Sequence, residues 1–139
     1  MDLLFEKTLL GKSISSNLYN INSNNDKLLK SQKDELVKEE NELLKIKNVI
    51  SENEFNNKLS VLKNKVDKYN QEKDRLYKDF IETKNSELRI FFDKINPLLQ
   101  TYLDEKKIYI LFEKKNIFIG RSSRDITDEL IKIIDKQFK

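Results

Sequence analysis

The apolar residues of the first half of the chain recur at the spacing of a supercoiled helix. Four of them lie seven positions apart: Leu29, Leu36, Leu43 and Ile50. A heptad repeat with charged residues between its apolar positions is typical of a helix that pairs with another helix. The seam positions between these four are polar: Lys33, Glu40 and Lys47. We therefore expect a long helix with a narrow apolar seam.

A second helix is predicted to begin directly after the first one ends. Ser51-Glu52-Asn53-Glu54 matches the capping box, in which Ser accepts from an early backbone N–H and Glu reaches back to the Ser N–H. The apolar positions that follow alternate in steps of about four and three: Phe55, Leu59, Leu62, Val66, Tyr69, Leu76 and Phe80. The two patterns predict an antiparallel helical coiled-coil hairpin arm over residues 13–104, with its turn near residues 48–51. The outgoing limb, residues 13–50, would span about 57 Å at 1.5 Å per residue.

The apolar stripe shifts register beyond Phe80. Its members are then Leu88, Phe91, Phe92, Ile95, Leu98, Leu99, Tyr102 and Leu103. Pro97 lies within this stripe, where its ring removes one helical hydrogen bond. We expect a kink there, with the helix continuing to about Asp104. Residues 1–21 also have helical spacing, although the run from Asn20 to Asn25 could break that helix.

The last third of the chain changes from helical to strand-like composition. Residues 108–112 and 117–119 are β-branched and aromatic, and the four residues between them are turn formers. They predict a β-hairpin over residues 108–119. A C-terminal helix is predicted over residues 126–137, capped by Asp125 or Thr127. Residues 1–12 and 105–139 would form a small β-sheet base, so the fold class is mostly α with a small β body (α+β).

Composition excludes several classes of protein. The chain has no cysteine and no histidine, which removes disulfides, thiolate chemistry and the commonest general base and transition-metal ligand. Charged and apolar residues each make up 37%, and regular apolar spacing argues against a disordered chain. No stretch approaches the roughly 18–20 apolar residues that cross a bilayer. The sequence predicts no catalytic, cofactor-binding or metal site, and no enzyme activity.

The charged residues mark surfaces rather than a reaction centre. Pairs such as Glu39 and Glu40 read as a solvated helix face, because acid–base catalysis requires a pocket that shifts a pKa. Cations outnumber the nearby anions on the return limb: Lys58, Lys63, Lys65, Lys68, Lys73, Arg75, Lys78 and Lys84. They could attract acidic protein segments or anionic lipid. The net charge of +3 makes nucleic acid the least favoured partner.

The layout resembles the Skp/OmpH family of periplasmic chaperones. The stretch Ile117-Phe118-Ile119-Gly120, followed by Asp125-Ile126-Thr127-Asp128-Glu129-Leu130-Ile131, is similar to the family's closing strand and the "DIT" start of its last helix. Leu4-Phe5-Glu6-Lys7, with Gly11-Lys12 after it, is similar to the segment after the family's first strand. The charged hairpin between them matches in kind and length.

The resemblance implies a homotrimer whose arms enclose a cavity. Unfolded outer-membrane proteins would be held there without ATP in the periplasm, with a possible weak contact to anionic lipid or lipopolysaccharide. The family begins with a signal peptide and a first strand. This sequence starts at Met1-Asp2-Leu3, so we expect both to be absent or shortened here. The alternative hypothesis is a cytoplasmic coiled-coil scaffold or tether that binds one specific partner. The residues that would contact a client are not indicated by the sequence.

Overall fold

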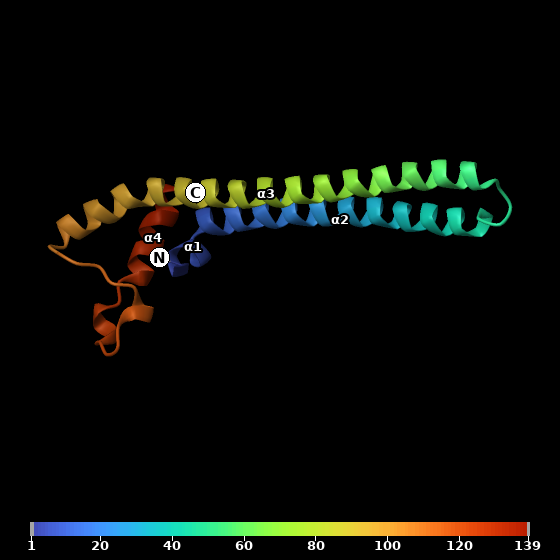
Figure 1. The fold of residues 1–139 in the computed structure, drawn as a ribbon. Coiled ribbons are helices and arrows are strands. Elements are labelled where there is room, and N and C mark those ends of the chain that lie inside the picture. Colours follow the sequence, from blue (N-terminus) through green and yellow to red (C-terminus); the bar gives the residue numbers. More distant parts are fainter. Residues whose placement is uncertain (1, 139) are drawn as a thin grey trace. The chain divides into compact units, whose positions relative to one another are not determined.

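The computed structural model describes residues 2–138 and consists mainly of helices (Figure 1). Its α-helices are α1 (Asp2–Lys7), α2 (Leu9–Ile46), α3 (Glu52–Glu105) and α4 (Thr127–Gln137). Two short 3-10 helices, η1 (Lys114–Asn116) and η2 (Ser122–Arg124), lie between α3 and α4. The helices divide into two compact units. We call residues 19–82 the hairpin unit, and residues 2–18 with 83–138 the core unit.

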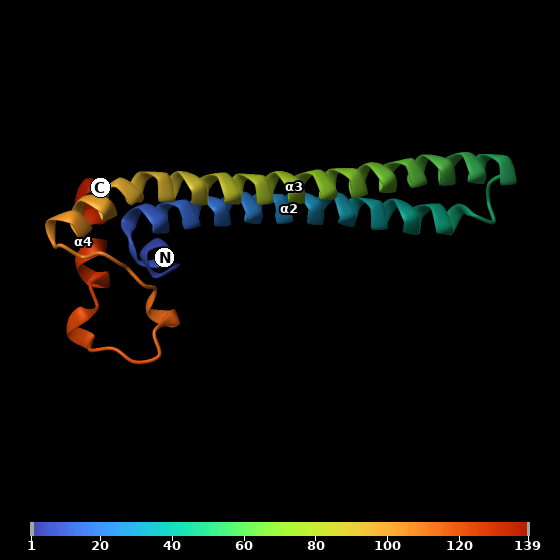
Figure 2. The same cartoon turned by 60° about the vertical axis from the view of Figure 1, so that its left-hand side comes forward.

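In the hairpin unit, α2 and α3 run antiparallel and are joined by a turn over residues 47–51 (Figure 2). The ammonium of Lys65 on α3 lies 2.7 Å from the carboxylate of Glu39 on α2. Leu43 is buried, and the other predicted seam residues, Leu29 and Leu36 on α2 and Ile50 in the turn, are half-buried. The narrow apolar seam expected from the heptads is therefore confirmed.

The predicted capping box begins α3. The backbone N–H of Glu54 donates to the Ser51 hydroxyl at 3.3 Å, and the Ser51 N–H donates to the Glu54 carboxylate at 3.2 Å. Both hydrogen bonds satisfy N–H groups that the first helical turn leaves without partners. This local motif fixes where the chain reverses.

The helix predicted for the start of the chain continues through Asn20–Asn25, where the sequence had left a break open, and α2 runs without interruption to Ile46. The Asn22 amide donates to the Asp26 carboxylate one turn later, at 3.1 Å. The interruption lies instead at Thr8, between α1 and α2. Thr8 is fully buried, and its hydroxyl donates to the Leu4 carbonyl at 2.7 Å and accepts from the Gly11 N–H at 3.2 Å.

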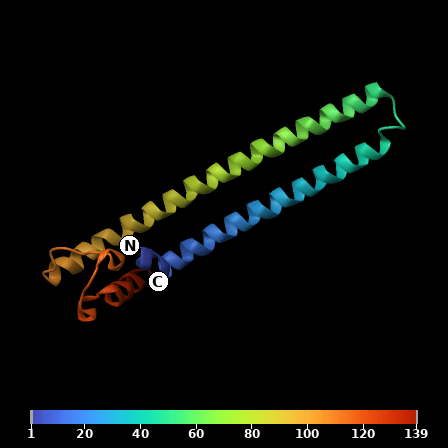
Figure 3. The ribbon, with the colours of Figure 1, turned by 60° about the horizontal axis from the view of Figure 1, so that its bottom comes forward.

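The core unit buries one apolar cluster. Its members come from all four helices: Leu4, Ile14, Phe91, Ile95, Leu99, Tyr102, Leu130 and Ile134. Phe5 meets Phe91 edge to face, with ring centroids 5.0 Å apart. Within this unit α1 contacts α4 (Figures 1 and 3). Most of these residues belong to the two stripes that the sequence predicted for residues 88–103 and 126–138.

Helix α3 continues through Pro97 and ends at Glu105, one residue beyond the expected end. Pro97 cannot donate to the carbonyl of residue 93, which stands on the exposed side of the helix, where water can replace the lost bond. The Thr101 hydroxyl donates to the Pro97 carbonyl at 3.0 Å. The helix therefore tolerates this proline at its surface.

The predicted β-hairpin over residues 108–119 was wrong. Residues 2–138 contain no strand, and residues 108–113 have no regular secondary structure. The predicted turn forms the 3-10 helix η1. A lone two-stranded hairpin is marginally stable in water, and here the side chains that it would need to bury remain exposed. The small β body is therefore not found within residues 2–138.

Candidate functional site

A groove of ≈ 710 Å³ lies in the core unit, between α1, the start of α4 and the segment that connects α3 to α4. Its apolar lining comprises Leu3, Leu4, Leu111, Phe112, Ile117, Phe118, Ile119, Ile126 and Leu130. Charged side chains stand among them: Asp2, Glu113, Lys114, Lys115, Arg121, Arg124 and Asp125. An open apolar groove of this size, with charges among its walls, suits a peptide or another protein chain better than a reaction centre.

Ion pairs fix the loop that forms one wall of this groove. Lys115 lies 2.7 Å from Asp2 and 3.0 Å from Glu113, and Lys114 lies 2.8 Å from Asp125. The hydrogen bonds that the Lys115 ammonium donates to Asp2 and Glu113 raise the pKa of Lys115 to about 12. These pairs lie at the surface, where water screens the attraction between their charges. The pairs set the course of the loop more than they stabilise the fold.

Asp125 connects this loop to α4. Its carboxylate accepts from the Thr127 N–H at 3.1 Å and from the Thr127 hydroxyl at 2.6 Å. Together with the ammonium of Lys114, these donors hold the pKa of Asp125 well below its usual range. Of the two predicted caps, Asp125 therefore accepts the backbone bond, whereas Thr127 donates its hydroxyl to Asp125.

The segment over residues 108–119 presents apolar side chains to solvent. Tyr109 is 95% exposed and Phe118 is fully exposed, and Ile110, Phe112 and Ile119 are exposed as well. A contiguous set of large apolar side chains at a protein surface marks an interaction site. This segment and the groove next to it form one continuous candidate surface in the core unit.

The hairpin unit has a second, more dispersed set of exposed apolar side chains. Its members are Tyr19, Ile21, Leu28, Val37, Leu44, Val49, Val61, Val66 and Tyr77. The aromatic residues that the sequence placed on the seam (Phe55, Tyr69 and Phe80) are only half-buried. These side chains can therefore pack in the seam and still contact another chain with the surface that remains exposed.

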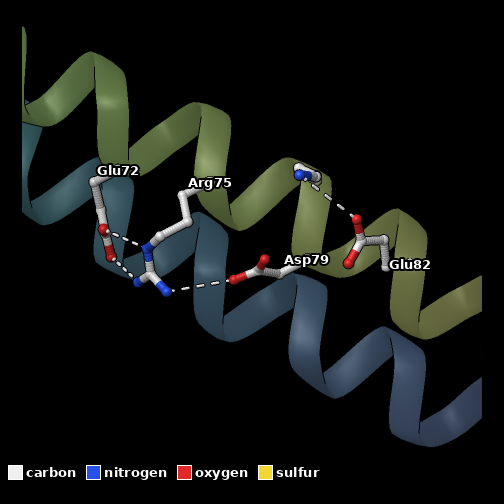
Figure 4. Close-up of polar contacts among 5 residues, drawn as sticks. Glu72, Arg75, Asp79 and Glu82 are labelled. Atoms are coloured by element: carbon white, nitrogen blue, oxygen red, sulfur yellow. Dashed lines mark hydrogen bonds and ion pairs between the residues drawn. The ribbon is translucent and has the colours of Figure 1, made fainter.

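The cations of the return limb are largely balanced by neighbouring anions. Arg75 donates to the Glu72 carboxylate at 2.9 and 2.7 Å and to Asp79 at 3.3 Å (Figure 4). The two hydrogen bonds to Glu72 raise the pKa of Arg75 further. Lys78 lies 3.8 Å from Glu82. Residues 51–82 carry seven cationic and seven anionic side chains, so this limb has no net positive charge as a whole.

No cluster of three or more Asp or Glu side chains within residues 2–138 could hold a metal ion. The most buried polar contact between side chains joins the Tyr102 hydroxyl to the Glu129 carboxylate at 2.5 Å, and this hydrogen bond raises the pKa of Tyr102. Raising that pKa makes the tyrosine a weaker acid, and the contact ties α3 to α4.

Comparison with known proteins gives the family. The family model described as outer membrane protein (OmpH-like) matches residues 1–134. The chain belongs to the OmpH-like family. The family resemblance inferred from the end motifs is thus confirmed.

A solved structure has the same fold as this OmpH-like chain. It comes from Caulobacter crescentus CB15 and is described as a candidate outer membrane chaperone (OmpH-like). The two share 19% sequence identity with a TM-score of 0.88, over 96% of this chain and 79% of the other. A search of curated proteins found no match. Within residues 2–138, no helix combines the length and the apolar character needed to span a membrane.

Two structural features of this OmpH-like chain were missed by sequence reasoning. The carboxylate of Asp135 on α4 accepts from the Leu9 N–H at 2.7 Å and so caps α2 from a distant part of the chain. A Cβ added to Gly11 would lie 1.8 Å from the Phe5 carbonyl oxygen, so glycine permits the close approach of α1 to α2. Gly11 inside a helical pattern was the available signal, whereas Asp135 gave none.

Proposed function

We propose that this protein is an ATP-independent holdase, which binds unfolded outer-membrane proteins in the periplasm and prevents their aggregation. Membership of the OmpH-like family carries the proposal. The exposed apolar side chains of the hairpin unit support it, since they are dispersed and offer many weak contacts. Such contacts suit clients of many sequences better than one specific partner.

We further propose that the protein acts as a homotrimer. The support is the exposed segment over residues 108–119 and the apolar groove beside it, which one chain leaves without a partner. Obligate assembly buries apolar surface that a monomer cannot cover. Three copies would place three hairpin units around a common space, where one client meets several surfaces at once. Contact with anionic lipid or lipopolysaccharide stays a secondary expectation.

Aggregation of a denatured β-barrel membrane protein tests the holdase. We expect light scattering after dilution from urea to fall when the chain is present in molar excess, with no dependence on ATP. A variant with Val37, Leu44 and Tyr77 replaced by serine should protect less, because apolar contacts are lost. A matched control replaces Lys30, Lys38 and Lys63 by serine on the same limbs. Undiminished aggregation with the folded wild-type chain contradicts the proposal.

A pull-down separates the holdase from the scaffold alternative. A holdase retrieves many unfolded outer-membrane proteins, whereas a scaffold retrieves one folded partner. Native mass spectrometry tests the trimer independently. Phe118→Asp should shift the distribution toward monomer, because it places a charge in the shared surface. The control Lys132→Asp, on an exposed position of α4, should leave the assembly unchanged.

A further inference from the structure

A second groove, of ≈ 430 Å³, lies between α2 and α3 of the hairpin unit, close to the turn. Its lining is Glu39, Glu42, Leu43 and Ile46 from α2, and Asn57, Lys58, Val61 and Leu62 from α3. Leu43 is buried, Ile46 and Leu62 are half-buried, and Val61 is 55% exposed. The groove thus has an apolar floor and polar rims.

The two rims of this groove carry opposite charge. Glu35, Glu39 and Glu42 are spaced four and three apart, which places their carboxylates on one side of α2. Lys58, Lys65 and Lys68 recur at seven and three on the matching side of α3. Residues 33–46 hold five acidic and three basic side chains, whereas residues 57–68 hold one acidic and four basic. We call these the acidic rim and the basic rim.

The ion pair between Glu39 and Lys65 sets the rims at the same height along the hairpin. No ion pair is described within residues 2–138 for Glu35, Glu42, Lys58 or Lys68. Lys58 acts on Glu54, one turn before it on α3, and helps to lower the pKa of that carboxyl. Glu35, Glu42 and Lys68 are therefore the charges available to a molecule that lies across the groove.

We propose that this groove docks the same groove of a second copy of the chain, with the acidic rim of each copy against the basic rim of the other. A two-fold axis parallel to the helices brings α2 of one copy opposite α3 of its partner, so opposite charges meet at equal heights. An axis perpendicular to the helices would bring like charges together. Isologous contacts require such a self-complementary surface.

The charge pattern favours a second copy over an unrelated peptide. A peptide would need one row of basic and one row of acidic side chains, separated by the distance between the two helices. A second copy of the chain presents these two rows because it has the same sequence. Exposed ion pairs are individually weak and screened by salt. The contact is therefore reversible and falls as ionic strength rises. It is independent of the holdase activity proposed above.

Cross-linking tests the contact directly in the full-length chain. The protein has no cysteine, so Val61→Cys on the groove rim supplies a single reactive thiol. Leu44→Cys is the matched control, because Leu44 is similarly exposed, at 58%, and lies two residues from both Glu42 and Ile46, on the opposite side of α2. A short bis-maleimide should link Val61→Cys chains several-fold more than Leu44→Cys chains at low salt. Equal yields at the two positions overturn the proposal.

Charge reversal distinguishes a second copy from any other contact. Glu35→Lys with Glu42→Lys, or Lys58→Glu with Lys68→Glu, should each reduce cross-linking of Val61→Cys chains several-fold. Mixing the two variants should restore it, because their rims are complementary again. Asp34→Lys with Glu40→Lys is the control of equal charge away from the rim. If the mixture does not recover cross-linking, the proposal is overturned. Circular dichroism checks that each variant is folded. The aggregation assay tests the holdase proposal separately.

Discussion

The core unit and the hairpin unit contain the same kinds of apolar residue but bury them to different extents. In the core unit, Phe91, Ile95 and Ile134 have no exposed surface. In the hairpin unit, Leu43 is the only buried residue among those that the structure describes. Two helices can cover one seam between them, whereas four helices enclose a volume. The fold therefore concentrates its stability in the core unit and leaves apolar surface free on the hairpin unit.

Truncation of one core residue and one seam residue should show the largest difference between the units. Phe91→Ala should lower the free energy of unfolding by about 3–5 kcal/mol, because it leaves a cavity beside Phe5. Leu36→Ala on the half-buried seam should lower it by only about 1 kcal/mol, since less surface is buried. Urea denaturation measures both. Equal losses would mean that the seam contributes as much as the core.

Gly11→Ala tests the close approach of α1 to α2. The added methyl would overlap the Phe5 carbonyl oxygen, so the backbone of α1 must move, at a cost of about 1–3 kcal/mol. Hydrogen exchange should accelerate at the Thr8 amide, which donates to the Leu4 carbonyl at 3.1 Å, and stay unchanged in the hairpin unit. Ser13→Ala, on an exposed position of the same helix, is the control. An unaffected Thr8 amide would contradict the close contact.

Ser51→Ala should cost about 1 kcal/mol and act only within the hairpin unit, because it removes the cap of α3. Hydrogen bonds from Ser51 lower the pKa of Glu54, so this cap is present above the ordinary pKa of 4.5 and is lost as pH falls. NMR titration of Glu54 should show its pKa return toward 4.5 in the variant. A depressed pKa that survives the substitution would assign it to another cause.

The smallest expected effect concerns Asp125 in the core unit. Its pKa is lowered chiefly by Lys114 and then by Thr127, so its contacts stabilise the loop above the ordinary pKa of 3.8 and are lost as pH falls below it. Exchange of the Thr127 amide should accelerate with acidification after correction for the intrinsic rate. In Asp125→Asn that dependence should disappear. The same pH response in both proteins would exclude Asp125 as its source.

Sequence reasoning was most accurate where the relevant contacts are local. The heptads indicated α2, the Ser51–Glu54 motif located the start of α3, and the apolar stripes identified Phe91, Ile95 and Leu130 as core. The Asn20–Asn25 run left a break of the helix open, but low helix propensity is a weak effect that a long helix overrides. Sequence reasoning failed over residues 108–119, where strand composition does not provide a pairing partner.

The candidate surfaces were predicted less well than the helices. The end motifs identified the family, but no pattern indicated the groove beside α1 or the opposite charge of the two rims of the hairpin groove. The cations of the return limb were noticed as a group, whereas their pairing with Glu72 and Asp79 depends on side-chain placement. A count of charges along the chain cannot distinguish cations that pair with neighbouring anions from cations that are free to bind another molecule.

The sequence by itself determined which residues are helical, where the long hairpin reverses and which family the chain resembles, because hydrogen bonds within a helix and at its caps join residues three or four positions apart. The tertiary structure alone decided that Thr8 separates α1 from α2, that Asp135 caps Leu9 and that residues 108–119 form no strand. Those outcomes depend on groups that are distant in sequence, and their energies exist only once the fold brings them together.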